Sequence, residues 1–171
     1  MDELIAFYSR AGENYVSGAI RKLAVENTEV VVAILQEITK ADLFKIEPYT
    51  PYSKDYSVCI NQAMCDQQRN ARPELIQYPE HIEQYETLYL GFPNYWGTMP
   101  MPVFTFLEKC RFCGKKIVLF YTHEGDGFGH SKEDIARIYP TMEIECGPAI
   151  RGVCISDADK MITRWMQERS L

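Results

Sequence analysis

The sequence predicts an α/β protein built on an open parallel sheet with helices on both faces. Three apolar runs, Leu4 to Tyr8, Leu88 to Phe92 and Ile117 to Tyr121, are each followed by a polar loop that contains glycine. Strands buried on both faces have this pattern. Segments with helical periodicity separate the runs, and this alternation indicates parallel strands joined by crossover helices.

Two further segments, 43–47 and 142–146, alternate apolar and polar residues. This period of two is typical of strands covered on one face only, so we predict them as the edges of the sheet. With the three buried runs they make a five-stranded sheet.

The first helix is predicted from Val31, Ile34, Leu35 and Ile38, whose spacing places them on one face. Asn27 or Thr28 is the expected N-cap, because both residue types cap helices well. Further helices are expected over 55–70 and 101–110, and after two segments that resemble capping boxes, 131–134 and 156–159.

A chain of 171 residues is expected to form one domain, residues 1–171. Its formal charge of −6 argues against a nucleic-acid partner, because no basic stripe is present to contact phosphates. Asp2 and Glu3 stand where a secretory signal would carry basic residues. We therefore expect a cytoplasmic protein whose six cysteines are reduced.

The segment from Thr87 to Leu107 carries no formal charge and has about the length of a membrane span. Pro93, Pro100 and Pro102 interrupt it, however. We predict a buried strand, a loop and a helix here, and no contact with a membrane.

Cys110 and Cys113 form a lone Cys-x-x-Cys pair. A zinc site needs further ligands at comparable spacing, so packing is the favoured interpretation and a redox dithiol is the alternative. The loop 122–130 contains His, Glu and Asp side chains that could in principle hold a metal: His123, Glu124, Asp126 and His130. It lacks helical ligand spacing, and we expect no metal.

In an open parallel sheet, ligands bind outside the carboxyl ends of the strands. The loops after the three buried strands cover residues 9–15, 93–98 and 122–129. The first offers a hydroxyl and a guanidinium, the second two adjacent aromatic rings, and the third a glycine-rich backbone that can approach a flat ligand. Together they suit a phosphate that carries an aromatic ring system.

Other chemistries fail on spacing. The chain has no Walker loop, no Gly-x-Gly-x-x-Gly and no Gly-x-Ser-x-Gly elbow. It also has no cysteine followed at the correct spacing by the arginine of a phosphatase cradle.

The chain resembles the flavodoxin-fold FMN proteins, of the group sometimes labelled Trp-repressor-binding-like. The resemblance runs through most of the chain, and its most specific part is NYWGTMP with its flanks. The matching stretches are FYSRAGENY (7–15), ENTEVVVAIL (26–35), ADLFKIEP (41–48), NARPEL (70–75), LGFPNYWGTMPMPVFTFLE (90–108), FCGKKI (112–117) and THEGDGFGHS (122–131). It implies a three-layer sandwich with strand order 2-1-3-4-5 and FMN as the cofactor.

In typical flavodoxins the phosphate-binding turn runs without interruption into the first helix, whereas the corresponding turn of this chain is divided in two. The segment from Ser9 to Gly12, which includes Arg10 and Ala11, opens it, and Asn27 and Thr28 restart it at the helix after an insertion. Ala11 stands where flavodoxins usually have Thr. Backbone N–H groups at a helix start favour an anion, so this turn is expected to hold the phosphate. Glu26 and Glu29 must then point away from it.

The remaining expected contacts come from the second and third loops. The side chains of Tyr95 and Trp96 are expected to flank the ring of the ligand, with packing in the core as the alternative. Their neighbours Pro93, Asn94 and Gly97 complete the binding loop. The resemblance implies that the pyrimidine side of the flavin is lined, mainly through backbone groups, by Thr122, His123, Glu124 and Gly125. Negative charge from Glu124 and Asp126 should lower the potential of the flavin.

Three functions follow from this site. The protein could carry electrons to a redox partner protein, or it could oxidise NAD(P)H and reduce a quinone or similar small acceptor. It could also be a binding module that keeps the fold without FMN, which the divided turn, Ala11 and Glu26 favour. The segments 99–102 and 49–56 could cover the flavin or form a homodimer surface, with packing as the default.

Overall fold

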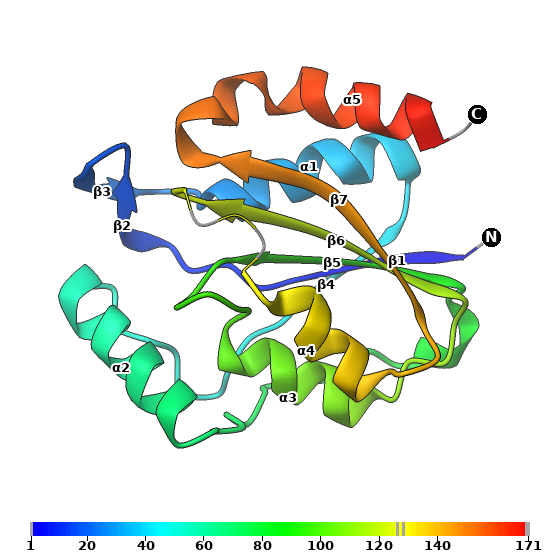
Figure 1. Cartoon of the computed structure of the whole chain (residues 1–171), viewed down its shortest axis with the longest axis horizontal. Coiled ribbons are helices and arrows are strands. Elements are labelled where there is room, and N and C mark those ends of the chain that lie inside the picture. The colour runs from blue at the N-terminus through cyan, green and yellow to red at the C-terminus, as the bar shows by residue number, and fades with distance from the viewer. Residues whose placement is uncertain (1, 126, 128, 170–171) are drawn as a thin grey trace.

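The sheet has the predicted strand order. The structure is a computed structural model that describes residues 2–125, 127 and 129–169. Its main sheet is five-stranded and parallel, in the order β4-β1-β5-β6-β7, which is 2-1-3-4-5 when only these strands are counted (Figure 1). The strands are β1 (Glu3–Phe7), β4 (Asp42–Lys45), β5 (Thr87–Pro93), β6 (Lys116–His123) and β7 (Glu143–Arg151).

Two helices cover each face of the sheet, and a further helix extends one of these layers. In Figure 1, α1 (Asn27–Thr39) and α5 (Ala158–Arg169) lie above the sheet. Below it lie α3 (Met101–Cys110) and α4 (Ser131–Ile138), with α2 (Tyr56–Gln68) beside α3. Short 3₁₀ helices span Ile82–Gln84 and Gly152–Asp157. The layers enclose two apolar clusters, one on each face of the sheet.

The last strand is longer than the predicted 142–146, because a bulge lets it continue. Leu119 of β6 pairs with Cys146, but Tyr121 pairs with Ala149, so the register shifts between them. A bulge adds residues to one strand and bends it. The bend brings Gly147 against α5, where an added Cβ would lie 2.7 Å from the Trp165 ring.

Helix α1 differs from its prediction in both its cap and its buried face. The N-cap is Glu26, whose carboxylate accepts a hydrogen bond from the Thr28 N–H, and neither Asn27 nor Thr28 has this role. The buried positions include Val32 but not Ile38, which is 40% exposed. The buried face is therefore turned slightly from the predicted one and is centred on Val31, Val32 and Leu35.

The two predicted capping boxes mark helix starts only approximately. Helix α4 begins at Ser131, but its N-cap is His130 and no side chain caps it. Ser156 belongs to the 3₁₀ helix, and α5 begins only at Ala158.

A β-hairpin occupies the insertion after β1 and was not predicted. Strands β2 (Gly12–Val16) and β3 (Ala19–Leu23) pair antiparallel in a separate two-stranded sheet. Ser17 and Gly18 have φ values of 53° and 86°. Positive φ at both positions is typical of the tight two-residue turns that match the twist of a hairpin. Figure 1 places the hairpin at the carboxyl-end edge of the main sheet.

The uncharged segment 87–107 forms β5, a loop and most of α3, as predicted. Within the described part of the chain, none of the helices has the length and apolar character needed to cross a membrane.

Candidate functional site

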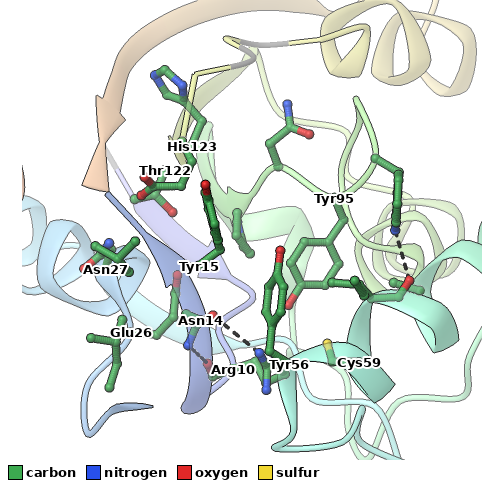
Figure 2. A pocket seen from close by; sticks show the side chains of 18 residues that line it. Arg10, Asn14, Tyr15, Glu26, Asn27, Tyr56, Cys59, Tyr95, Thr122 and His123 are labelled. Carbon is green, nitrogen blue, oxygen red and sulfur yellow. Dashed lines mark hydrogen bonds between the residues drawn. The ribbon is translucent and has the colours of Figure 1, made fainter. Parts of the chain in front are cut away.

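A pocket of about 400 Å³ opens at the carboxyl ends of the strands. Its walls come from the loops after β1, β5 and β6, the start of α1, the hairpin and α2. In the view of Figure 2, Glu26 and Asn27 lie at one end and Tyr95 and Cys59 at the other, with Tyr15 and Tyr56 between them. The pocket therefore has a polar helix terminus at one end and aromatic walls along its length.

The loop after β5 is held by a tight turn from Tyr95 to Thr98. Trp96 and Gly97 both have positive φ, 53° and 82°, and Tyr95 bridges to Thr98. A bulky residue rarely adopts this conformation. Here it directs the Trp96 indole to α2, where Nε1–H donates to the Ile60 carbonyl at 3.0 Å. The ring thus lines the pocket and is 47% exposed.

The neighbouring aromatic, Tyr95, combines the two roles expected for it. Its ring meets Tyr8 edge-on at 6.0 Å and Tyr52 at 6.4 Å, so it packs against the core. It also lines the pocket. Burial raises the pKa of the Tyr95 phenol, which therefore stays protonated at neutral pH.

Arg10 is a buried cation in the wall of the pocket. Its side chain is 8% exposed, and its Nη1 donates to the Ser53 carbonyl at 2.8 Å. Its Nη2 donates to the carbonyl of Glu13 and to Asn14 Oδ1. Nε is buried without a hydrogen-bond partner. A buried donor without a partner is costly, so this atom is one that a ligand could satisfy.

The hairpin spans the pocket because both of its sides are attached. At one side, the Glu13 N–H donates to the Lys54 carbonyl at 2.9 Å, and the Tyr15 ring stacks on Tyr56 of α2 at 6.2 Å. At the other side, the Ser17 N–H donates to the carboxylate of Glu124 at 3.0 Å. The hairpin thereby links α2 to the loop after β6.

At the start of α1, one of the two acidic side chains faces the pocket. Glu29 points away, as expected, because it pairs with Lys45 at 2.7 Å and accepts from the Ser9 hydroxyl at 2.6 Å. Glu26 does not point away: it is 5% exposed and lines the pocket. Burial raises the pKa of Glu26 to about 7, although hydrogen bonds from Thr28 oppose this.

The loop after β6 is organised by His123 and by a side chain from the loop after β5. The Gly125 N–H donates to His123 Nδ1 at 3.0 Å. Asn94 joins the two loops, since its Nδ2 donates to the Gly127 carbonyl at 3.0 Å and its Oδ1 accepts from the Gly97 N–H at 2.9 Å. Asp126, predicted to add charge here, lies outside the described residues.

The structure brings most of the predicted site residues together. Those that line the pocket are Arg10, Asn27, Pro93, Asn94, Tyr95, Trp96, Thr122, His123 and Glu124. Of the others, Ser9, Ala11, Gly97 and Gly125 lie in the same loops and Thr28 lies in the first turn of α1, but none of these five lines the pocket. The Thr28 hydroxyl, for example, is fully buried and shares a 3.0 Å hydrogen bond with that of Thr122.

Sequence reasoning missed the outer walls of the pocket. Tyr15, Val16 and Leu23 come from the hairpin, whose Ser17-Gly18 turn was an available signal. Helix α2 contributes Tyr56, Cys59, Ile60 and Ala63. The predicted helix, 55–70, contained all four of these residues, but no sequence signal placed this helix beside the pocket.

Neither cysteine of the Cys-x-x-Cys pair lines the pocket. Cys110 ends α3, and Cys113 follows it in the connection to β6. All six cysteines are free. Within residues 2–125, 127 and 129–169, no three His, Cys, Asp or Glu side chains are grouped so that they could hold a metal ion.

Comparisons with known proteins agree with this architecture. A family model described as flavodoxin matches residues 19–169. A candidate flavoprotein from Bacteroides eggerthii has 22% identity and a TM-score of 0.77, over 99% of this chain and 98% of its own. A flavoprotein from Lactobacillus acidophilus, solved in complex with FMN, has 18% identity and a TM-score of 0.67, over 96% and 98% of the two chains.

An NADPH-quinone reductase from P. pentosaceus has 13% identity and a TM-score of 0.53, over 98% and 97% of the two chains. No curated protein sequence matches the chain. At these identities the solved structures show a shared fold.

Proposed function

The chain belongs to the flavodoxin family, and on this premise we propose that it is a redox protein that binds FMN non-covalently and transfers electrons through it. The observation that carries the proposal is the pocket itself, which joins the start of a helix to aromatic walls at the carboxyl ends of the strands. Ligands bind at this edge in open α/β sheets. The related flavoprotein solved in complex with FMN supports the choice of ligand.

The residues of the pocket fit such a ligand. Arg10 presents a buried Nε without a partner, and the start of α1 favours an anion. We propose that these two features and Asn27 receive the phosphate, with the nearby turn residues Ser9, Ala11 and Thr28 shaping the backbone. Glu26 is the acidic lining residue at the start of α1, and its charge opposes a phosphate there.

The flat part of the ligand would lie between the two loops at the other strand ends. We propose that Tyr95 and Trp96 flank the ring, and that Pro93, Asn94 and Gly97 fix the loop that carries them. Thr122, His123, Glu124 and Gly125 would line the pyrimidine side. These groups bind and orient the ligand and exclude water, while FMN supplies the one- and two-electron chemistry.

The two tryptophans of the chain allow a direct test of this placement. Trp96 lines the pocket, whereas Trp165 lies in α5, packed against the apolar cluster on the other face of the sheet. Replacing Trp165→Phe leaves Trp96 as the only source of tryptophan fluorescence. Addition of FMN should quench this emission strongly, because the flavin would lie against the ring.

In the matched Trp96→Phe protein, FMN should quench the emission of Trp165 much less. Absorbance of the purified protein provides the first readout, since a bound flavin is yellow. A colourless protein that shows no quenching with added FMN would instead indicate a binding module without flavin, and the proposal would fail.

A second function is favoured by the Tyr15–Tyr56 pair, which forms an aromatic wall beside the expected ring. Such a wall suits a flat acceptor, so the chain could oxidise NAD(P)H and reduce a quinone, as the name of one structural neighbour implies for that protein. Tyr15→Ala should then raise the KM for quinone more than it changes FMN affinity. An electron carrier would show no rapid NAD(P)H oxidation with quinone present.

We also propose a cytoplasmic location, because free cysteines are typical of reducing compartments. A redox partner protein and a homodimer remain predictions.

A further inference from the structure

The buried carboxylate of Glu26 stands where the proposed phosphate would meet α1, and we infer that it determines which flavin the pocket accepts. When Glu26 is protonated, the pocket binds the phosphate-bearing flavin; when Glu26 is ionised, the phosphate is excluded and only an uncharged flavin such as riboflavin binds normally. This inference rests on the proposed function, since it concerns the same pocket.

The first observation is the geometry of the helix start. Glu26 is the N-cap of α1, in extended conformation, and its Oε2 accepts from the Thr28 N–H at 3.0 Å. The first N–H groups of a helix have no partner within it, and they are the donors that an anion uses. One of these donors is already bonded to a carboxylate that belongs to the chain. The position is therefore occupied by an internal anion whenever Glu26 is ionised.

The second observation concerns the opposite charge in the same pocket. Arg10 is 8% exposed, lines the pocket and keeps a buried Nε without a partner. Its two terminal nitrogens are already bonded to the segments around it. Among the described residues, Arg10 donates hydrogen bonds to Ser53, Glu13 and Asn14 and none to Glu26, so the Glu26 carboxylate does not satisfy the Arg10 Nε donor. An acceptor from outside the chain can do so.

The charges that surround Glu26 come from several elements. Arg10, from the loop after β1, favours the ionised form, and Glu29, one turn along α1, disfavours it. Tyr95 lies close enough to interact with Glu26, and the loop after β6 brings His123 and Glu124 to the same pocket. Burial dominates this balance and raises the pKa of Glu26 to about 7.

Both forms of Glu26 are therefore present at neutral pH, and the charge on the ligand decides between them. The second pKa of a phosphate monoester is about 6, so FMN is a dianion above neutral pH. Binding the FMN dianion beside an ionised Glu26 would place two negative groups close together where little solvent reaches them. The complex avoids this by taking one proton from solvent, which ends on the Glu26 carboxylate. Riboflavin brings no charge and needs no proton.

The test is a titration of flavin-free protein with FMN and with riboflavin, followed by flavin fluorescence between about pH 7 and about pH 9. If one proton is taken up, the Kd for FMN should rise roughly tenfold per pH unit once Glu26 is ionised, or about fiftyfold over this range. The Kd for riboflavin should stay constant. Calorimetry in buffers of different ionisation enthalpy should report the uptake of a proton with FMN only.

Two variants sharpen the test. Glu26→Gln retains an oxygen that can accept from the Thr28 N–H, so the cap is conserved while the charge is lost. It should bind FMN with a Kd that is independent of pH, and more tightly than the natural protein at the upper pH. Glu29→Gln is the matched control, because it removes one negative charge from the same turn outside the pocket. It should keep the full pH dependence.

The possible failures can be distinguished. If the natural protein binds FMN with a constant Kd, or if Glu26→Gln keeps the dependence, the inference is overturned and the proposed function stands. If neither protein binds FMN or riboflavin at any pH, the proposed function fails and the inference fails with it. If Glu26→Gln binds FMN but the natural protein binds it at no pH, the inference is also overturned, because the natural protein with Glu26 protonated should bind FMN. The pH dependence of the natural protein needs no variant, so misfolding of a variant would not hide the result.

Discussion

The raised pKa of Glu26 makes the flavin-free protein less stable as the pH rises. A carboxyl whose pKa is higher in the folded than in the unfolded state contributes stability below its unfolded pKa. That contribution is lost as the pH rises through the folded pKa. Each pKa unit corresponds to about 1.4 kcal/mol. Burial moves the pKa of Glu26 from 4.5 to about 7, so about 3 kcal/mol should be lost between about pH 4 and about pH 8.

The assay compares urea unfolding of the natural protein with that of Glu26→Gln at each pH. The difference between their free energies of unfolding removes the contributions of all other groups. This difference should shift by about 3 kcal/mol in favour of the variant over this range. Glu29→Gln is a control of opposite sign: although partial burial opposes it, hydrogen bonds from Lys45 and Ser9 lower the pKa of Glu29. Parallel curves for the natural protein and Glu26→Gln would refute the reasoning.

Three other changes test the packing around the site. Gly91→Ala places a Cβ 2.3 Å from the Phe120 ring, so thermal unfolding should show a loss of about 1–3 kcal/mol from overpacking. Phe106→Ala empties a fully buried position and should cost about 3–5 kcal/mol in urea unfolding, without preventing FMN binding. Trp96→Phe removes the hydrogen bond to the Ile60 carbonyl; it should cost only about 1 kcal/mol of stability but weaken FMN binding measured by equilibrium dialysis.

The buried strands were predictable because the pattern that identifies them is local. β1, β5 and β6 are apolar along most of their length, and the structure confirms all three. The loops that follow them were predictable as parts of a site for the same reason: in a parallel sheet, strand ends share one edge. Applying this rule requires only the order of strands and helices along the chain, and it requires no knowledge of distances between residues.

The outer walls and the start of α1 depend on contacts between distant residues, which the sequence pattern does not contain. Tyr15 and Tyr56 stack although 41 positions separate them in the printed sequence. Glu26 was expected to point away from the phosphate, but folding buries it and makes it the cap in place of Asn27. Residue type favoured Asn27 as a cap, and the tertiary environment overrode this preference. The limits of the domain and the roles of the site residues stay predictions.

The hairpin gives the pocket a wall whose opening does not require the protein to unfold. A two-stranded sheet is at best marginally stable alone, and β2 and β3 pair with each other outside the main sheet. Segments with few buried apolar contacts open at a small fraction of the global free energy of unfolding. The Tyr15–Tyr56 stack and the Ser17–Glu124 hydrogen bond would then set how often the wall opens. A flavin could exchange through such brief local openings while both apolar clusters stay closed.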